Sequence, residues 1–328
     1  MPTPASHVVT VGTRASALAL TQTGAVAAAL GAAGDLDVRV VRISTVGDRS
    51  TGSLATLGGT GVFVTALRDA LLDGRCDVAV HSLKDLPSGA AEGLLIAAVP
   101  EREDPRDALC ARAGLTLAQL PVGARVGTGS PRRAAQLRAV RPDLVVVDIR
   151  GNVDTRLKRV GPDDLDAVVL AAAGLSRLGR LDAATDLLDA RVMAPAPGQG
   201  ALAVEARASD LEDPSTPLAR ALAALDDPPT RLAVTAERAL LARLEAGCAA
   251  PIGACARVVG PSLVLDAVVC KPDGTAQLRR SLALALPSGQ RPLDVIARLE
   301  VAARLGAMLA DELLASGASE LAELGVVR

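Results

Sequence analysis

The sequence of 328 residues contains no tryptophan or tyrosine and a single phenylalanine, Phe63. Without aromatic rings, the stacking of bases that usually holds single-stranded nucleic acid is not possible. Lysine occurs only at positions 84, 158 and 271, so arginine supplies nearly all of the positive charge. The five cysteines form no CxxC pair, and only two histidines accompany them. We therefore expect neither a metal site nor a disulfide framework, and a reducing, cytoplasmic environment fits this cysteine usage.

The sequence also predicts neither a secretory signal nor a membrane span. The N-terminal stretch MPTPASHVVT has no basic segment followed by an apolar one. Residues 15–34 carry no charge, but they are mostly alanine with glycine, threonine and glutamine. That composition is too weakly hydrophobic for a membrane span, so we predict a buried helix there.

Charge is unevenly distributed along the chain. The formal net charge is −2, yet residues 121–160 hold nine basic residues against three acidic ones. This contrast favours a localised anion site over a general nucleic-acid surface. Half of the residues are hydrophobic, which is enough to build the cores of two or three domains.

Apolar runs of four to eight residues alternate with longer helical patterns, which is typical of βαβ units around mostly parallel sheets. We interpret the charged segment EREDPRD (101–107) as a hinge or linker between two such series, and APAPGQG (194–200) as the return crossing. ALAVEAR (201–207) is predicted to rejoin the first sheet. A long helix over 230–246, β-like runs and a helix over 291–316 indicate a third domain. Further strands are predicted at 7–12, 37–45, 76–82, 94–100, 124–130, 144–150 and 166–174, and further helices from Ser16, over 63–74, from Pro131 and around 155–160.

Two stretches resemble each other. VGTRAS (11–16) and VGTGSPRR (126–133) both leave a strand through Gly-Thr and enter a helix through serine, with arginine close by. Free backbone N–H groups, the positive end of the helix dipole, a hydroxyl and a guanidinium together form a cradle for a carboxylate or phosphate. Arginines in a first helical turn oppose the dipole, a cost that an incoming anion would remove. Because ligands bind at the carboxyl ends of strands in open α/β sheets, we expect both cradles to face a shared cleft.

Two further stretches are candidates for binding or chemistry. In HSLKDLPS (81–88), Asp85 can offer a carboxylate to a developing cation while Lys84 and Ser82 hold an anionic arm; the alternative is an ordinary exposed turn. In DIRGNVDTRLKR (148–159), Arg150 and Arg156 have a spacing that suits pairing with carboxylates; the alternative is a solvated basic helix.

The cysteines, His81 and a glycine-rich stretch are the remaining candidates for a functional role. Cys248 lies in the small-residue loop GCAAPIGAC (247–255), where a thiol can be a covalent anchor or nucleophile, although most free cysteines are inert core residues. Cys255 stays ambiguous. For His81 we favour a structural or helper role. The glycine-rich GGTG (58–61) fits neither a P-loop nor a dinucleotide fingerprint, and we interpret it as a mobile loop over the cleft. Apolar β patterns predict inert thiols at Cys76, Cys110 and Cys270.

These motifs together resemble one family, the porphobilinogen deaminases, also called hydroxymethylbilane synthases. The resemblance covers most of the chain in the family's order and is thin beyond about residue 255. It is carried by GTRASALALTQ (12–22), STVGDRS (44–50), HSLKDLP (81–87), EREDPRDAL (101–109), GTGSPRRAAQL (127–137), IRGNVDTRL (149–157), LAAAGLSRLG (170–179), APGQGALAVEAR (196–207) and ERALLARLEAGCAAPIGA (237–254).

The resemblance implies an enzyme that condenses four porphobilinogen molecules stepwise on a covalently bound dipyrromethane primer, releases ammonia, and frees hydroxymethylbilane by hydrolysis. Cys248 matches the cysteine that carries the dipyrromethane cofactor through a thioether, and Asp85 matches the catalytic aspartate. Asp154 stands where the family often has asparagine, and it could compete for the charge of Arg150 and Arg156. The side chains expected to bind acetate and propionate groups are Arg14, Ser16, Ser82, Lys84, Thr128, Ser130, Arg132, Arg133, Arg150, Arg156, Arg177 and Gln199.

We accordingly predict an α/β protein of three domains, of which the first two resemble the hinged domain pair of periplasmic binding proteins. Domain 1 spans 1–102 with about 201–222 and holds the catalytic aspartate, and domain 2 spans the arginine-rich 103–200. Domain 3, residues 223–328, is a smaller α+β domain with the cofactor cysteine. We expect a monomer whose partner is the small molecule porphobilinogen, with no nucleic acid and no membrane.

Two rival functions remain at this point. A non-catalytic two-domain anion-binding protein would use the same cradles without chemistry. A regulatory nucleic-acid binder would use the basic region 121–160, but the lack of aromatic residues and the acidic remainder of the chain argue against it.

Overall fold

The computed structural model describes residues 8–34, 36–43, 61–245, 250–289, 291–322 and 324. The chain divides into two compact units. The first unit consists of Met1–Arg102 with Ala201–Thr230, and the second of Glu103–Gly200 with Arg231–Arg328. The boundary between Arg102 and Glu103 falls inside the segment that the sequence marks as a linker, and residues 99–106 form neither helix nor strand. The division into three domains stays a prediction.

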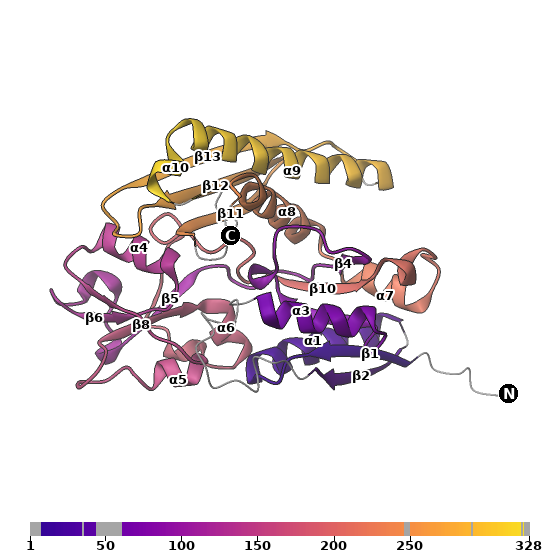
Figure 1. Ribbon diagram of the computed structural model, residues 1–328, viewed down its shortest axis with the longest axis horizontal. Helices are drawn as coiled ribbons and strands as arrows, with labels where there is room; N and C mark the ends of the chain where they lie inside the picture. The colour runs from indigo at the N-terminus through magenta and orange to yellow at the C-terminus, as the bar shows by residue number, and fades with distance from the viewer. Residues whose placement is uncertain are drawn as a thin grey trace. The chain divides into compact units, whose positions relative to one another are not determined.

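The first unit contains a five-stranded sheet in the order β2-β1-β3-β10-β4. Figure 1 labels β1, β2, β4 and β10 of this sheet. β1 runs parallel to β2 and β3, whereas β10 is antiparallel to β3 and β4. The prediction that 201–207 rejoins the first sheet is therefore confirmed. The strands are β1 (Val8–Thr13), β2 (Asp37–Arg42), β3 (Val78–Ser82), β4 (Leu94–Ala98) and β10 (Leu202–Arg207).

Helices cover both faces of this sheet, because alternate strand residues point to opposite sides. Val78 packs in one apolar core with α1 (Ala17–Gly34) and α7 (Pro217–Leu225). Its neighbour Ala79 packs in another core with α3 (Gly61–Leu72). The strand β3 is thus buried on both faces, and its carboxyl end opens at the edge where the site lies.

Helix α1 is the one described helix that is long and apolar enough to cross a membrane by length and composition. In the structure it packs instead along the sheet, with Val26 and Leu30 in the same core as Val9 and Val11 of β1. Ser16 caps its first turn by accepting a hydrogen bond from the Ala19 N–H at 3.3 Å, as predicted. These contacts are those of a helix that covers a sheet.

The second unit contains two sheets. The first has the order β7-β6-β8-β5-β9, with β6 parallel to β7 and β8 and with β5 antiparallel to β8 and β9. Its elements are β5 (Asp107–Ala111), β6 (Arg125–Gly127), α4 (Pro131–Val140), β7 (Val145–Val147), α5 (Val153–Leu157), β8 (Ala167–Ala171), α6 (Ala172–Arg177) and β9 (Asp186–Leu187).

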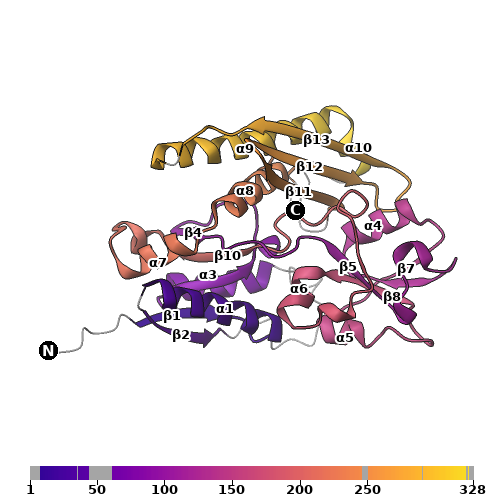
Figure 2. The same ribbon diagram turned by 180° about the vertical axis from the view of Figure 1, so that it is seen from behind.

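The other sheet of this unit is antiparallel, in the order β11-β12-β13, and α9 lies along it (Figure 2). Leu240, Leu265 and Leu309 bring α8, β12 and α9 into one core. The elements are α8 (Pro228–Arg243), β11 (Ile252–Val259), β12 (Ser262–Cys270), β13 (Gln277–Ala285), α9 (Pro292–Ala315) and α10 (Ala318–Leu321). Short 3-10 helices complete the chain: η1 (Leu83–Asp85), η2 (Arg112–Gly114), η3 (Leu117–Gln119), η4 (Leu181–Ala183) and η5 (Ala208–Leu211).

Hydrogen bonds attach the return crossing, residues 194–200, to β11 and α8. The Ala254 N–H donates to the Pro195 carbonyl at 2.9 Å, and the Gly198 N–H donates to Glu237 Oε2 at 2.6 Å. A Cβ on Gly253 would lie 2.6 Å from the Ala194 carbonyl oxygen, so only glycine allows this approach. The return crossing at 194–200 is therefore fixed against β11 and α8.

The predicted α/β class is confirmed, with differences at particular elements. β3 begins at Val78 rather than at Cys76, and the linker ends where β5 begins at Asp107. The strands β5 and β9 and the helices α6 and α7 were not predicted as separate elements. They are short or alanine-rich, and their patterns do not distinguish a strand from a buried helix.

Candidate functional site

The carboxyl end of β3 opens into a small pocket of the first unit. Arg14, which follows β1, and Ser82 and Asp85, which close β3 and η1, line it together with Gln22 of α1. Because β1 and β3 are parallel, their carboxyl ends meet at one edge of the sheet. Three of the predicted site residues are thereby brought together around one cavity.

A hydrogen bond from the buried Gln22 side chain helps to fix the position of Ser82 in this pocket. Gln22 Nε2 donates to Ser82 Oγ at 3.2 Å, and Gln22 is buried. Asp85 and Lys84 are half-buried in η1. Among the described candidates of this unit, Ser16 and Lys84 do not line the pocket, and Ser16 serves as the cap of α1. Gln22 ends the motif GTRASALALTQ, but it was not predicted from the sequence to be a site residue.

A buried charged group adjoins the pocket. His81, which also lines the pocket, places Nε2 3.1 Å from Glu205 Oε2, and Arg68 Nη2 lies 2.8 Å from Glu205 Oε1. Burial alone would raise the pKa of Glu205, but the nearby His81 and the hydrogen bonds from Arg68 lower it to about 2. Neither Glu205 nor Arg68 was predicted from the sequence to belong to a site. The available signal was an acidic residue in the middle of the otherwise apolar run ALAVEA.

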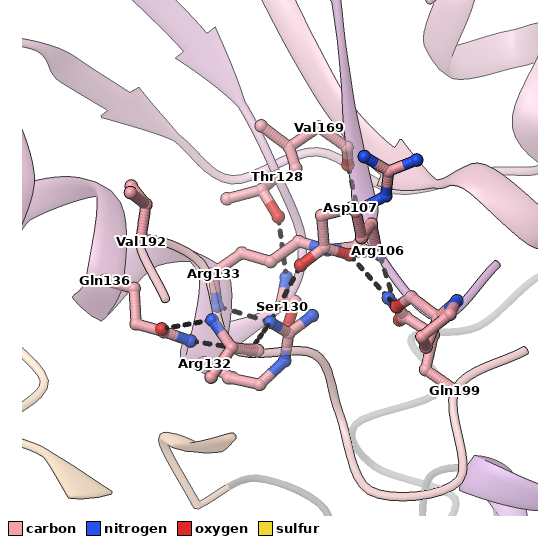
Figure 3. A network of polar contacts seen from close by, with 12 residues as sticks. Arg106, Asp107, Thr128, Ser130, Arg132, Arg133, Gln136, Val169, Val192 and Gln199 are labelled. Carbon is pink, nitrogen blue, oxygen red and sulfur yellow. Dashed lines mark hydrogen bonds and ion pairs between the residues drawn. The ribbon is translucent and has the colours of Figure 1, made fainter. Parts of the chain in front are cut away.

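The second predicted cradle is built around an internal carboxylate, that of Asp107 (Figure 3). Arg132 Nη1 lies 2.8 Å from Asp107 Oδ2, and Arg133 Nη2 lies 2.8 Å from Oδ1. Gln199 Nε2 also donates to Oδ1 at 2.8 Å, and Arg133 Nη2 donates to Gln199 Oε1 at 3.4 Å. Despite complete burial, the two guanidinium groups lower the pKa of Asp107 well below its usual range. These four residues form a buried, ionised network.

Asp107 thus supplies a negative charge to the arginines that begin α4. We expected an incoming anion to offset the conflict between these arginines and the helix dipole, whereas the structure offsets it with a side chain of its own. The predicted start of α4 is confirmed, since Ser130 Oγ accepts from the Arg133 N–H at 3.4 Å. Thr128 Oγ1 accepts from the Ser130 N–H at 3.2 Å.

Arg150 and Arg156 present their charge differently. The Arg150 side chain is 67% exposed, and its Nε lies 3.8 Å from Asp148 Oδ2. Arg156 Nε donates to the Gly151 carbonyl at 2.8 Å. Burial, and then the positive charges of Arg133 and Arg150, lower the pKa of Arg156. This part of the second unit therefore holds like charges close together, where an anion would be stabilised.

Two further side chains of this region are placed clearly. Arg177, at the end of α6, donates from Nη2 to the Gly200 carbonyl at 2.6 Å, and burial lowers its pKa. Asp154 pairs with Arg180 at 2.8 Å. This partner is neither Arg150 nor Arg156, for whose charge Asp154 could have competed.

The cysteine expected to carry the cofactor, Cys248, lies outside the described residues, as does the segment 44–60 with its glycine-rich stretch. Burial raises the pKa of three core thiols, those of Cys76, Cys110 and Cys270, to about 11. All three are free and buried, so the prediction that they are inert is supported. Cys255 is half-buried on β11. Among the residues that the structure describes, no group of histidine, cysteine and acidic side chains could hold a metal ion.

Comparison with known proteins gives a consistent result. Residues 9–213 match the family described as "Porphobilinogen deaminase, dipyromethane cofactor binding domain", and residues 231–315 match "Porphobilinogen deaminase, C-terminal domain". The porphobilinogen deaminase of Leifsonia xyli subsp. xyli is 60% identical over 97% of this chain and 95% of its own length. That of Cutibacterium acnes is 56% identical over 96% of each chain. Among solved structures, a TRAP periplasmic solute binding protein from Desulfovibrio salexigens aligns with a TM-score of 0.38 at 11% identity, covering 68% of this chain and 73% of its own.

Proposed function

Because the chain belongs to the porphobilinogen deaminase family, we propose that Asp85 is its catalytic carboxylate and that Cys248 carries its dipyrromethane cofactor. The reaction of this family is the stepwise head-to-tail condensation of four porphobilinogen molecules with release of ammonia, followed by hydrolysis to hydroxymethylbilane. The observation that carries the proposal for Asp85 is its place in one pocket with Arg14 and Ser82.

The pocket suits the charge that develops during deamination. Loss of ammonia from porphobilinogen leaves a cation on the pyrrole, and a fixed carboxylate beside it lowers the energy of that state. Asp85 supplies the carboxylate, while Arg14 and Ser82 bind an acetate or propionate group of the same pyrrole. Binding and stabilisation of charge thus come from neighbouring strand ends. We further propose that Lys84 and Ser16 contribute to carboxylate binding.

The arginines of the second unit are suited to bind the carboxylates of the cofactor. A dipyrromethane carries four carboxylates, and Arg150, Arg156 and Arg177 offer cations that do not titrate near neutral pH. Burial and, after it, repulsion by Arg133 and Arg150 lower the pKa of Arg156, and such an anion would offset both effects. When bound, the cofactor supplies the free α-carbon to which the first pyrrole is joined. These arginines hold and orient its carboxylates.

The Asp107 network gives a second layer of support for carboxylate binding. We propose that Asp107 fixes the directions of the Arg132 and Arg133 guanidinium groups, so that their remaining N–H groups meet a carboxylate without reorientation. Gln199 shares this network, and Thr128 and Ser130 shape the turn that precedes α4. Preorganisation of this kind lowers the entropic cost of binding.

We also propose the three-domain division stated above, with residues 223–328 as the cofactor-attachment domain. The end of the first family match at 213 and the start of the second at 231 support a boundary in this region. Action as a monomer in the cytoplasm remains part of the proposal, as does the absence of nucleic-acid and membrane partners.

Intact-mass measurement combined with turnover tests the proposal. The purified protein should weigh more than its translated sequence by two deaminated pyrroles, and Cys248→Ser should lose this added mass. Asp85→Asn should keep the mass but lose turnover by about 10²- to 10³-fold, as on removal of a group that stabilises transition-state charge. Asp73→Asn, at an exposed aspartate of the same unit, is the matched control and should be unchanged.

The outcomes separate the rivals. A protein without added mass would be the non-catalytic anion-binding protein. Near-normal turnover in Asp85→Asn would show that another group stabilises the cation.

A further inference from the structure

Gln136 of α4 is fully buried and has no role in the function proposed so far. Its side-chain amide makes two hydrogen bonds to the backbone of one residue, Ala194. The Ala194 N–H donates to Gln136 Oε1 at 2.8 Å, and Gln136 Nε2 donates to the Ala194 carbonyl at 3.0 Å. Because both residues are buried, this pair of bonds satisfies a donor and an acceptor inside the protein. Gln136 therefore fixes the backbone at the start of the return crossing.

The same carbonyl group also holds Arg132, one of the arginines expected to bind carboxylates. Arg132 and Gln136 are four residues apart on α4, so both extend from one face of the helix (Figure 3). Arg132 Nη1 donates to the Ala194 carbonyl and to Asp107 Oδ2. Arg132 Nε is buried and has no hydrogen-bond partner among the residues that the structure describes. An unpaired buried donor is costly, so the acceptors at Nη1 are what hold the guanidinium in this direction.

A residue of the antiparallel sheet completes this network. Arg279 of β13 is half-buried and donates from Nη2 to Gln136 Oε1 at 3.2 Å. The same nitrogen donates to the Val192 carbonyl at 3.1 Å. Arg279 thus holds the chain directly at Val192 and, through Gln136, at Ala194.

Two further contacts seat α4 against the same sheet. Ala135 packs with Val268 and Cys270 of β12 in one apolar cluster. Arg138 Nη1 donates to the Pro272 carbonyl at 2.9 Å, in the turn between β12 and β13. The antiparallel sheet therefore supports the helix from which Arg132 extends.

We propose that Gln136 and Arg279 are positioning residues of the cofactor site. They fix Ala194, the backbone acceptor of Arg132, and so fix the direction in which this guanidinium meets a carboxylate of the cofactor. The inference rests on the function proposed above, because it requires Arg132 to bind the cofactor. The sheet that follows Cys248 in the sequence then also sets the geometry of an arginine that binds the cofactor.

The energetic argument is one of preorganisation. A guanidinium that is already held in place binds an anion at a lower entropic cost than a mobile one. If Ala194 is released, Arg132 loses one of the two acceptors at Nη1 and can turn. Binding free energies are reciprocal, so a network that favours the bound cofactor must itself be stabilised by the cofactor.

The first test follows cofactor assembly in full-length protein made without porphobilinogen. Added porphobilinogen should raise the intact mass by two deaminated pyrroles, and the measured quantity is the concentration that gives half the maximal rate. Arg279→Met keeps an unbranched apolar stem but cannot donate, so we expect this concentration to rise about 10- to 100-fold. Gln136→Met should act in the same direction. Arg279→Lys can still donate to Gln136 Oε1 and should recover part of the loss.

Leu282→Ala separates positioning from stability. Leu282 lies on the same strand as Arg279, but three residues further along and therefore on the opposite face. It packs against the core that α8 and α9 form with this sheet. Truncating it should lower the stability of the second unit in urea and leave the porphobilinogen concentration unchanged. A merely structural role of Arg279 would instead give equal effects on assembly in variants of equal stability.

Hydrogen exchange on the unaltered protein keeps the inference testable if the variants do not fold. Loading with the cofactor should slow exchange of the Ala194 N–H, which donates to Gln136 Oε1. The amide of Leu309, in the core on the other face of the sheet, is the internal control and should be unchanged.

The inference is overturned if Arg279→Met assembles the cofactor at the normal porphobilinogen concentration, or if it is no weaker in assembly than Leu282→Ala at equal stability. An Ala194 amide whose exchange does not respond to loading would also overturn it. If the unaltered protein gains mass while these results fail, only the roles of Gln136 and Arg279 are wrong. If the unaltered protein gains no mass, the proposed function itself fails.

Discussion

Replacing Asp107 by asparagine tests the physics of the arginine network most directly. The carboxylate is fully buried between Arg132 and Arg133, whose side chains are 5% and 7% exposed. Asparagine keeps the shape but removes the charge, so two buried guanidinium groups lose their counter-charge. Breaking a buried ion pair in this way costs about 3–5 kcal/mol of unfolding free energy. For a unit of this size that corresponds to a fall of about 6–20 °C in Tm.

The assay follows from the composition. Because tryptophan and tyrosine are absent, unfolding by heat or urea should be followed by far-UV circular dichroism rather than by intrinsic fluorescence. Hydrogen exchange at β5 and α4 would assign the loss of stability to the second unit. Asp311→Asn is the matched control, because Asp311 pairs with Arg243 at 2.6 Å in the same unit but is 54% exposed. We expect that control to cost about 0–1 kcal/mol.

The pH dependence gives an independent check on Asp107. Its pKa in the folded protein lies below the ordinary value of 3.8, so its contribution to stability is complete above that value. The contribution is lost as the pH falls through the folded pKa, and Asp107→Asn should lack this acid-dependent component. If Asp107→Asn is no less stable than Asp311→Asn, the argument that the internal carboxylate neutralises the buried arginines is wrong.

Further predictions concern a turn, the thiols and acid stability. Gly129→Ala should destabilise the second unit against urea and weaken cofactor retention measured by mass, because the new Cβ would clash with the Ile149 carbonyl oxygen. Gly161→Ala is the control, since a Cβ at that position meets open space. The buried thiols of Cys76, Cys110 and Cys270 should resist a thiol reagent at pH 8 in the folded protein and react in urea, and their rapid labelling without urea would contradict the assigned burial. The pKa of Glu205 falls from 4.5 to about 2, so its contribution to stability is complete above pH 4.5 and is lost as the pH drops towards 2. Glu205→Gln should flatten that part of the stability curve measured by circular dichroism, and an unchanged curve would show that Glu205 is not ionised in the folded state.

Short sequence patterns predicted the structure correctly where a residue type has a strong preference for one position in a helix or strand. The caps at Ser16 and Ser130 and the start of α4 at Pro131 were predicted because serine and proline have strong positional preferences at helix starts. The return of 201–207 to the first sheet was also predicted correctly. Cys110 was placed in an apolar β pattern, but β5 was not predicted as a separate strand, because its five residues directly follow a charged segment.

Partnerships across long stretches of chain could not be predicted in this way. Asp107 was regarded as the end of a linker, yet it meets Arg132, Arg133 and Gln199 across 25 to 92 residues. Glu205 was assigned to a strand with no role, yet it meets Arg68 from 137 residues away and His81 from the neighbouring strand. A spacing in sequence does not show which charged side chains share a buried site, because that depends on strand order and register.

The sequence by itself determined the α/β class, the family and the candidate residues, because motifs such as HSLKDLP and GTGSPRRAAQL keep their chemistry within a few consecutive positions. Only the tertiary structure decided that the arginines of α4 have an internal counter-charge and that Glu205 lies buried between Arg68 and His81 beside the pocket of Asp85. The physical reason is that the energy of a charge depends on its burial and its nearest partners, and both are set by chain segments that are distant in sequence.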